Sequence, residues 1–510
     1  MPSEHRLHPV SVVFAFLAQI RTFIVPGLLV MIGASSRGGN DWWQPWMMAL
    51  VIPNAIVAVI RYVSYRYRYD PNEMVIHSGL VFRRERHIPY GRIQNVDAVQ
   101  NVLHRLLNVV EVRVETGGGQ TPEATMSVLP VSAFQEMRDR VFAERQALAS
   151  GESVGGAAPV AVETPSATVL LELPPKELLL CGFLENRGGV LIAAGLGLAW
   201  EIGLMDRLMS RFGNQLSGRR MMRDLARGIL NNAEVAFERI LLSVVAFISL
   251  LFFVRILSMV WALVRLYGFR LSLAAGDLRS EYGLTTRVTA TIPLRRIQTL
   301  TIKEGPLHRL ADRVSVRANT AGGQPRDGSG GVRERESLAP ILPRPALSAL
   351  VQQVLPDVHS YDSVAWQPVS SRAFRREIKG WLVLSLVAQA ALVALMGRWS
   401  LLLAPGLLTW AIVCARKTIA HLGWAVTSDA VFFRRGWLWR RVSVVRLAKI
   451  QVVTLLASPF DRRAAMARVR VDTAGASEST RIDIPYLPYD VAHGLHLRLA
   501  HEAASRRFLW

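Results

Sequence analysis

Six long apolar stretches, arranged in three pairs, constrain this chain of 510 residues more than any other feature. A helix needs about 20 mostly apolar residues to cross the hydrocarbon of a bilayer. The stretches that approach this length run from Val10 to Ile32, Trp43 to Ile60, Gly188 to Leu204, Ile240 to Val264, Trp381 to Met396 and Trp399 to Cys414. A long polar stretch follows each pair, so the sequence predicts a membrane protein with three helical hairpins.

Basic residues follow the second stretch of every pair, and cytoplasmic flanks carry an excess of such residues. They are Arg61, Arg66 and Arg68, then Arg265 and Arg270, then Arg416 and Lys417. We therefore expect the N-terminus and all three polar regions on the cytoplasmic side of the membrane. The loop at 205–239 disagrees, because it is rich in arginine and would be external. Its amphipathic character favours an interfacial helix, and its side of the membrane stays open.

Three charged residues lie inside the apolar stretches, namely Arg21, Glu201 and Arg255. An arginine at mid-bilayer costs about 2.5–3.5 kcal/mol on insertion scales. Each should therefore pair, extend to the interface or face a wet cavity, and Glu201 is a candidate partner for Arg255. A misplaced helix boundary or a side chain that reaches the interface is the alternative.

Three segments of the polar regions repeat one another. Residues 79–116, 283–320 and 436–473 align without a gap. The residues shared by all copies are Gly79/Gly283/Gly436, Arg83/Arg287/Arg440, Ile93/Ile297/Ile450, Gln94/Gln298/Gln451, Arg105/Arg309/Arg462, Val112/Val316/Val469, Arg113/Arg317/Arg470 and Thr116/Thr320/Thr473. Agreement at so many positions indicates duplication of one unit, a helix pair followed by a polar domain.

Each polar domain is predicted to be rich in β structure. Ser78-Gly79 separates two short runs and indicates a hairpin. Val109 to Thr116 alternates apolar and polar residues, as a half-buried strand does. Val131 to Gln146 has the pattern of an amphipathic helix, and the other copies end alike, near Arg344 to Val354 and Pro488 to His501.

The motifs SGLVFRRERHIPYGRIQNVD from Ser78, PLHRL from Pro306 and VRVDTAG from Val469 resemble those of bacterial pleckstrin-homology (PH) domain membrane proteins. Three such domains with paired helices resemble the YdbT-like group. The resemblance implies an α+β membrane protein with three PH-like antiparallel β-barrels. Each barrel would carry a C-terminal helix and follow a pair of transmembrane helices. The copies depart from the pattern at Val102, Arg446 and Asp461, where other copies have proline, proline and histidine.

The repeat and the composition together predict the domain boundaries. Residues 147–177 and 358–378 are expected to be linkers, the first because it is rich in Gly, Ala, Ser and Pro. The helix pairs are expected at 1–65, at 178–266 with the amphipathic loop, and at 379–417, and the PH-like domains at 66–146, 267–357 and 418–505.

A formal net charge of +21 raises the question of a nucleic-acid partner. No nucleic-acid-binding motif accompanies the charge, so no nucleic-acid partner is expected. A basic face beside anionic lipid explains the charge. The candidate surface for an anionic lipid or a protein partner is Arg83, Arg84, Arg86 and Arg92. Alternatively, these arginines and the repeated Arg105/Arg309/Arg462 stabilise the fold by binding carboxylates or turn carbonyls.

The sequence offers no constellation for catalysis, metal binding or a cofactor. The glycine runs at Gly117–Gly119 and Gly322-Gly323 lack the residues of a phosphate loop. The recurring His104 and His308 have no second ligand nearby, and the repeated glutamines are expected to tie a turn to the backbone. Cys181 and Cys414 form no CxxC motif and are expected to be buried thiols. We expect neither an enzyme nor a small-molecule substrate.

The leading hypothesis is a membrane scaffold whose cytoplasmic PH-like domains dock partner proteins or one another through sheet edges and barrel mouths. A transporter or channel with regulatory domains is the alternative that the intramembrane charges support, and a sensor of anionic lipid is another. The bilayer is an expected partner, together with another membrane protein or a second copy. The sequence leaves the choice between these partners open.

Overall fold

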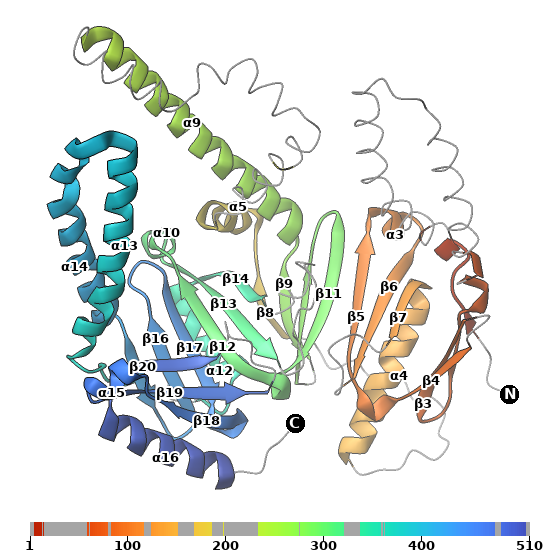
Figure 1. Ribbon diagram of the computed structural model, residues 1–510. Helices are drawn as coiled ribbons and strands as arrows, with labels where there is room; N and C mark the ends of the chain where they lie inside the picture. The colour runs from red at the N-terminus through yellow and green to blue at the C-terminus, as the bar shows by residue number, and fades with distance from the viewer. Residues whose placement is uncertain are drawn as a thin grey trace. The chain divides into compact units, whose positions relative to one another are not determined.

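The computed structural model describes residues 5–12, 14, 59–60, 62–79, 83–116, 124–150, 168–185, 197, 233–274, 276–320, 337–358, 361, 363–474 and 481–505. The chain forms two compact units. One contains residues 1–167, 172–270 and 279–291, and the other contains residues 168–171, 271–278 and 292–510. Antiparallel sheets and the helices that pack on them make up both units (Figure 1).

The first repeat contains two small antiparallel sheets and a closing helix. The first sheet holds β1 (His5–Arg6), β2 (Arg66–Tyr69), β3 (Glu73–Ser78) and β4 (Arg84–Pro89). The second begins with β5 (Ile93–Asn101), β6 (Val109–Thr116) and β7 (Ala124–Pro130), and α4 (Val131–Ser150) follows. Apolar residues of both sheets and of the helix share one core, including Met74, Val112 and Met137, and burial of such side chains stabilises the sandwich.

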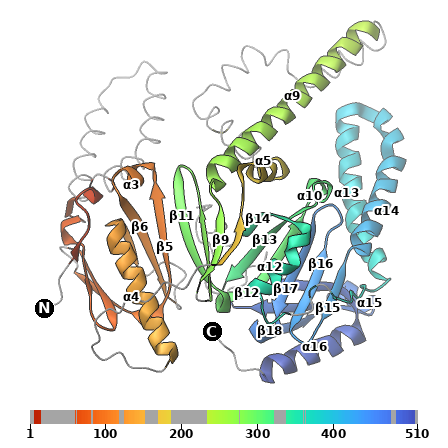
Figure 2. The same ribbon diagram turned by 180° about the vertical axis from the view of Figure 1, so that it is seen from behind.

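The third repeat has the same design. The two ribbon views agree that its closing helix covers the last strands of the repeat (Figures 1 and 2). Its strands are β15 (Gly423–Val426), β16 (Ala430–Arg435) and β17 (Arg440–Arg446), then β18 (Ile450–Leu456), β19 (Met466–Thr473) and β20 (Ile482–Pro488). Helix α16 (Tyr489–Ser505) contributes Leu495 and Leu499 to a core that also holds Val431 and Val469.

The second repeat supplies the same sequence of elements. They are β9 (Arg270–Ala274), β10 (Asp277–Tyr282), β11 (Thr286–Pro293), β12 (Ile297–Glu304), β13 (Arg313–Thr320), β14 (Ser337–Pro343) and α12 (Leu347–Val354). The closing helices of all three repeats lie where the sequence predicts them, because an apolar stripe at helical spacing follows the last strand each time.

The described strands do not show the closed barrel that the resemblance implies. Strands β4 and β5 belong to different sheets, and so do β17 and β18. Instead, β5 of the first repeat pairs with β11 of the second, and β12 of the second repeat pairs with β17 of the third. Hydrogen bonds between strands therefore join successive repeats.

Each repeat begins before its membrane helices, which the sequence did not indicate. Strand β1 pairs with β2, and β8 (Thr168–Glu172) is the neighbour of β9 in its sheet. In the third repeat Gln367 forms an isolated bridge to Trp424 of β15. Parts of the predicted linkers at 147–177 and 358–378 thus belong to sheets. In each repeat, a segment from before the predicted spans therefore lies beside the first strand after them.

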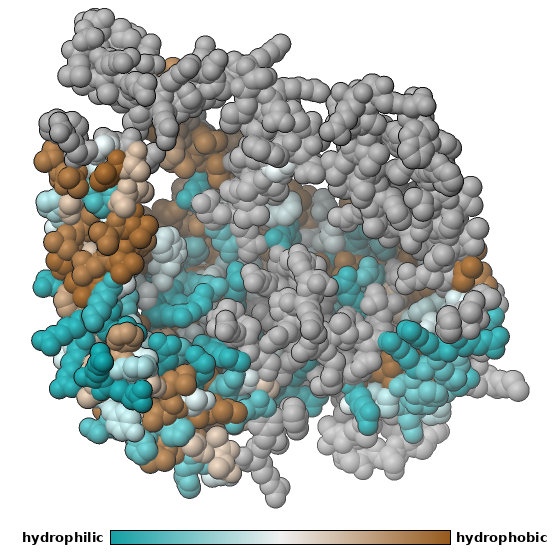
Figure 3. Space-filling view, viewed as in Figure 1, coloured by the Kyte–Doolittle hydropathy of each residue, from teal (hydrophilic) through white to brown (hydrophobic). Residues whose placement is uncertain are grey.

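Three described helices are long and apolar enough to cross a membrane. They contain residues Val244–Leu266 within α9 (Ala233–Leu266), Ala373–Ala394 within α13 (Ala373–Met396), and Ser400–Ala420, which spans η5 (Gly397–Leu403) and α14 (Ala404–Ala420). Helices α13 and α14 lie side by side in both ribbon views (Figures 1 and 2), and hydrophobic residues gather over them (Figure 3). The two helices pack against each other as a helical hairpin. The first two predicted spans and Gly188 to Leu204 lie almost wholly outside the described residues.

Candidate functional site

The junction between the first and second repeats is an antiparallel pairing of β5 with β11. Gln100 lies opposite Arg287, Val99 opposite Val288, and Ala98 opposite Thr289. The Arg105 guanidinium donates a hydrogen bond of 2.8 Å to the carbonyl oxygen of Leu284, in the turn before β11. Arg105 therefore stabilises a contact between repeats, which is the structural alternative that the sequence left open.

The junction between the second and third repeats is built in the same way. Glu304 lies opposite Arg440, Lys303 opposite Arg441, and Ile302 opposite Val442. Arg309, the counterpart of Arg105, donates to the carbonyl oxygen of Leu438 at 3.2 Å, in the turn before β17. The Glu304 carboxylate also lies 3.7 Å from the Arg440 guanidinium.

The two junctions have an identical register. In the alignment of the repeats, Gln100 corresponds to Glu304 and Arg287 corresponds to Arg440. These are the residues that face each other at the two junctions. The same edge of one repeat therefore recognises the same edge of the next repeat twice. Matching main-chain hydrogen bonds and matching side-chain positions make this a specific mode of strand addition.

The second junction has an additional clamp at Arg446, where the other copies have proline. Its guanidinium donates to the carbonyl oxygens of Ile297 at 2.7 Å and Leu294 at 3.1 Å, and lies 3.3 Å from the Asp357 carboxylate. Burial, the largest cause, lowers the pKa of Arg446, while Asp357 raises it. The departure from the family pattern thus places a buried cation between two repeats.

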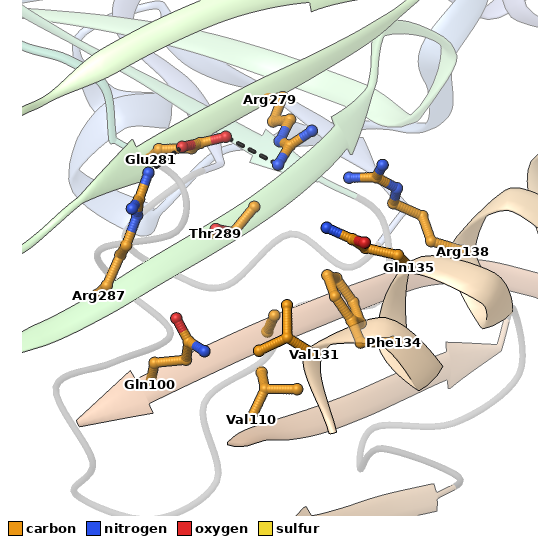
Figure 4. A pocket seen from close by; sticks show the side chains of 11 residues that line it. Gln100, Val110, Val131, Phe134, Gln135, Arg138, Arg279, Glu281, Arg287 and Thr289 are labelled. Carbon is orange, nitrogen blue, oxygen red and sulfur yellow. Dashed lines mark hydrogen bonds and ion pairs between the residues drawn. The ribbon is translucent and has the colours of Figure 1, made fainter. Parts of the chain in front are cut away.

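A small basic pocket lies beside the first junction (Figure 4). It has a volume of about 190 Å³ and takes its basic groups from Arg138 of α4, Arg279 of β10 and Arg287 of β11. The Glu281 carboxylate lies 2.8 Å from both Arg279 and Arg287. Burial, the largest cause, lowers the pKa of Arg279, while Glu281 raises it. Three guanidinium groups and one carboxylate leave a positive excess that suits a single anionic group.

The predicted surface of Arg83, Arg84, Arg86 and Arg92 is exposed along and beside β4. Carboxylates interrupt it. Glu85 alternates with the arginines, and the His87 imidazole lies 2.8 Å from Glu73 and 3.3 Å from Glu85. The hydrogen bond to Glu73, the largest cause, raises the pKa of His87. The surface is therefore mixed in charge rather than uniformly basic.

The repeated glycines occupy a backbone conformation that other residues rarely adopt. Gly79, Gly283 and Gly436 have φ angles of 89°, 114° and 85°. A Cβ on Gly283 would collide with the carbonyl oxygen of Thr286, and one on Gly436 with that of Trp439. The hairpin turn therefore requires glycine.

The repeated glutamines and threonines mark one β-bulge. Ile93, Ile297 and Ile450 lie opposite Thr116, Thr320 and Thr473, and the register shifts immediately afterwards in every copy. The Gln298 amide donates to the carbonyl oxygen of Arg296 at 3.3 Å, as expected of a structural glutamine. Gln451 is exposed, and the side chain of Gln94 lies outside the described residues.

The other departures in the third copy have a local explanation. Ser458 and Asp461 form a capping box on α15 (Pro459–Arg463). The aspartate that stands where the other copies have histidine therefore caps this short helix. In the first copy, Asn101 caps α3 (Val102–Leu106), and His104 is buried and stacks on Phe14 at 4.1 Å. His104 therefore packs within the first repeat.

The charged residues of the apolar stretches are described only in part. Arg255 of α9 donates to the carbonyl oxygen of Phe183 at 2.8 Å, at the end of α5 (Pro175–Leu184). Arg21 and Glu201 lie outside the described residues, so the pairing of Glu201 with Arg255 stays a prediction. Cys181 and Cys414 are buried free thiols, as expected, and no cluster of metal-ligating side chains lies within the described residues.

Sequence reasoning missed the junctions, the Arg446 clamp and the basic pocket. It also missed a repeated left-handed residue, because its type differs between copies. Asn108, Asp312 and Ala465 occupy the same alignment position, and each has a φ of 51°. The aligned motifs on either side of these three residues were the signal that could have revealed their shared conformation.

Repeated antiparallel PH-like domains joined to apolar helices define a transmembrane protein with repeated bacterial PH domains. The bacterial PH domain family matches residues 12–145, 228–358 and 380–503, and the chain belongs to that family. It is 22% identical over 503 residues to the UPF0699 transmembrane protein YdbT of Bacillus subtilis (strain 168), covering 95% of each chain. No solved structure matches the chain.

Proposed function

We propose that this protein is a non-enzymatic membrane scaffold whose PH-like domains bind proteins by strand addition at the cytoplasmic face of the inner membrane. The observation that carries the proposal is the repeated junction. Two successive pairs of domains bind through the same strand edges in the same register. A strand edge that pairs with another domain twice within the chain is suited to pair with a strand of another protein.

The strand pairings also support the placement of all three domains on the same side of the membrane. Strands cannot pair across a bilayer, so the first domain shares a side with the second, and the second shares a side with the third. The basic flanks of the predicted spans favour the cytoplasm for that side. Tethering there raises the effective concentration of the docking edges for a membrane partner.

Site-directed photocrosslinking in native membranes tests the proposal. A photoreactive residue at Thr454 in β18 or at Arg86 in β4 should crosslink to protein. The matched control is Leu497 of α16, which is 54% exposed but lies on no strand edge. Crosslinks to protein at both edges and few at Leu497 are expected. Crosslinks to lipid alone at both edges would overturn the scaffold in favour of lipid sensing.

A further inference from the structure

Two strand edges at opposite ends of the repeat series have no strand beside them among the described residues. They are β4 of the first repeat and β18 of the third, which correspond to the strands that form the junctions. Strand β4 corresponds to β11 and β17, and β18 corresponds to β5 and β12. Each chain therefore presents one strand of each of the two kinds that pair at a junction.

The burial of equivalent residues agrees with this. Thr299 of β12 is 2% exposed beside β17, whereas its counterpart Val452 of β18 is 54% exposed. Val444 of β17 is fully buried, whereas its counterpart His87 of β4 is exposed. Pairing with a further strand would cover these positions in the way that the internal junctions cover theirs.

We propose that β18 of one copy pairs with β4 of a second copy, antiparallel and in the register of the two internal junctions. The inference rests on the proposed docking role of the strand edges and names the partner. Transfer of the register places Thr454 opposite Arg86, Leu456 opposite Arg84 and Val452 opposite Ile88.

The repeated arginine provides a second argument. Arg105 and Arg309 each bind a turn carbonyl of the next repeat. Arg462 occupies the same position in the third repeat and is exposed, and no hydrogen bond of its side chain lies within the described part of the chain. In the proposed contact, the second copy supplies the acceptor that the next repeat supplies to Arg105 and Arg309.

The facing side chains are compatible. Leu456 lies opposite Arg84, whose aliphatic stem can cover it. The corresponding internal pair, Lys303 with Arg441, places two like charges together and is nevertheless formed. The charged residues of β4 discourage unspecific strand pairing. Because the same charges also oppose the proposed pairing of β18 with β4, we expect this contact to be weaker than the internal junctions. Confinement of both copies to one membrane raises their effective concentration and offsets the weakness.

The symmetry of the contact follows from the two different edges. Each copy offers β4 to one neighbour and β18 to another, so the interface is heterologous. Such an interface produces rings or open filaments rather than a two-fold dimer. A contact between two β18 strands is not expected.

Disulfide crosslinking between two full-length variants tests the register. One variant carries Thr454→Cys, the other carries Arg86→Cys, and the two bear different tags and are expressed together. Opposed residues of antiparallel strands have Cα atoms about 4.5–5.5 Å apart, within the range of a disulfide. The matched control replaces Arg86→Cys by Arg84→Cys, which shifts the pair diagonally to about 7–8 Å. The native Cys181 and Cys414 are buried and are present in every variant.

After oxidation in native membranes, the Thr454/Arg86 pair should give a mixed-tag product in about fivefold excess over the control pair. Adding Arg462→Ala should lower that yield by about tenfold, as loss of a charge-assisted hydrogen bond does. Arg463→Ala is its matched control, because Arg463 is exposed on the same short helix, and it should leave the yield unchanged.

Absence of a mixed-tag product, or equal yields from both pairs, would overturn the second copy as partner. The photocrosslinks at Thr454 and Arg86 then separate the two proposals. Capture of a different protein would leave the docking role standing, and absence of any captured protein would end both.

Discussion

Arg446 donates a hydrogen bond of 2.7 Å to the backbone carbonyl oxygen of Ile297, in the preceding repeat. The donor stands where the first two repeats have Pro89 and Pro293, which carry no side-chain donor. One substitution in a duplicated unit has thus added a polar clamp to one junction. Since Arg446 is 8% exposed, the clamp acts away from most of the solvent.

Replacing this arginine should weaken the second junction. Arg446→Ala leaves the carbonyl oxygens of Ile297 and Leu294 without their donor, and an unsatisfied buried group costs about 1–3 kcal/mol. We expect a lower midpoint of thermal unfolding in detergent. Arg435→Ala, at an exposed position on β16, is the control and should change stability by less than about 0.5 kcal/mol. Equal effects of the two changes would contradict the clamp.

The turn glycines should not tolerate a side chain. Gly283→Ala and Gly436→Ala introduce a Cβ that meets a backbone carbonyl oxygen at a positive φ, so each should destabilise by about 1–3 kcal/mol. Gly494→Ala is the matched control, because it lies in α16 with open space around it. Helix propensity should make that change stabilising by up to about 1 kcal/mol. Thermal unfolding in detergent measures all three, and a neutral Gly283→Ala would refute the argument.

All three domains should be protected from reagents outside the cell. Single cysteines at Ser150, Ser329 and Ser477, in a background without Cys181 and Cys414, should resist a membrane-impermeant maleimide in intact cells. They should react after the membrane is permeabilised, which controls for accessibility. Labelling of any one of them in intact cells would contradict the cytoplasmic orientation.

Lipid binding by the first domain should be weak and sensitive to salt. Glu85 and Glu73 lie among the arginines of the β4 surface, so only a diffuse attraction to anionic headgroups remains. A soluble fragment joining residues 1–9 to 62–150 retains β1 and the first-domain core. Its sedimentation with anionic liposomes should disappear at moderate salt, since screening shortens surface attraction to about 10 Å at 0.1 M. Salt-resistant binding to one headgroup, lost in Arg84→Ala, would favour a lipid sensor.

Local patterns in the sequence determined the membrane hairpin of α13 and α14, the repeat, the closing helices and the turn glycines. Each of these depends on residues close together in the chain. Helical periodicity needs only neighbouring turns, and the collision that requires glycine at Gly283 involves Thr286, three residues away. The duplicated spacing then transferred each local prediction from one copy to the others.

Only the tertiary structure decided which strand edges meet. The sequence of β5 specifies a strand, but main-chain groups are alike along every strand, so the pattern does not tell whether β4 or β11 pairs with it. The pairing of Gln100 with Arg287 and the bond from Arg105 to Leu284 span nearly two hundred residues. The distinctive role of Arg446 was invisible for the same reason, because its acceptors belong to another repeat.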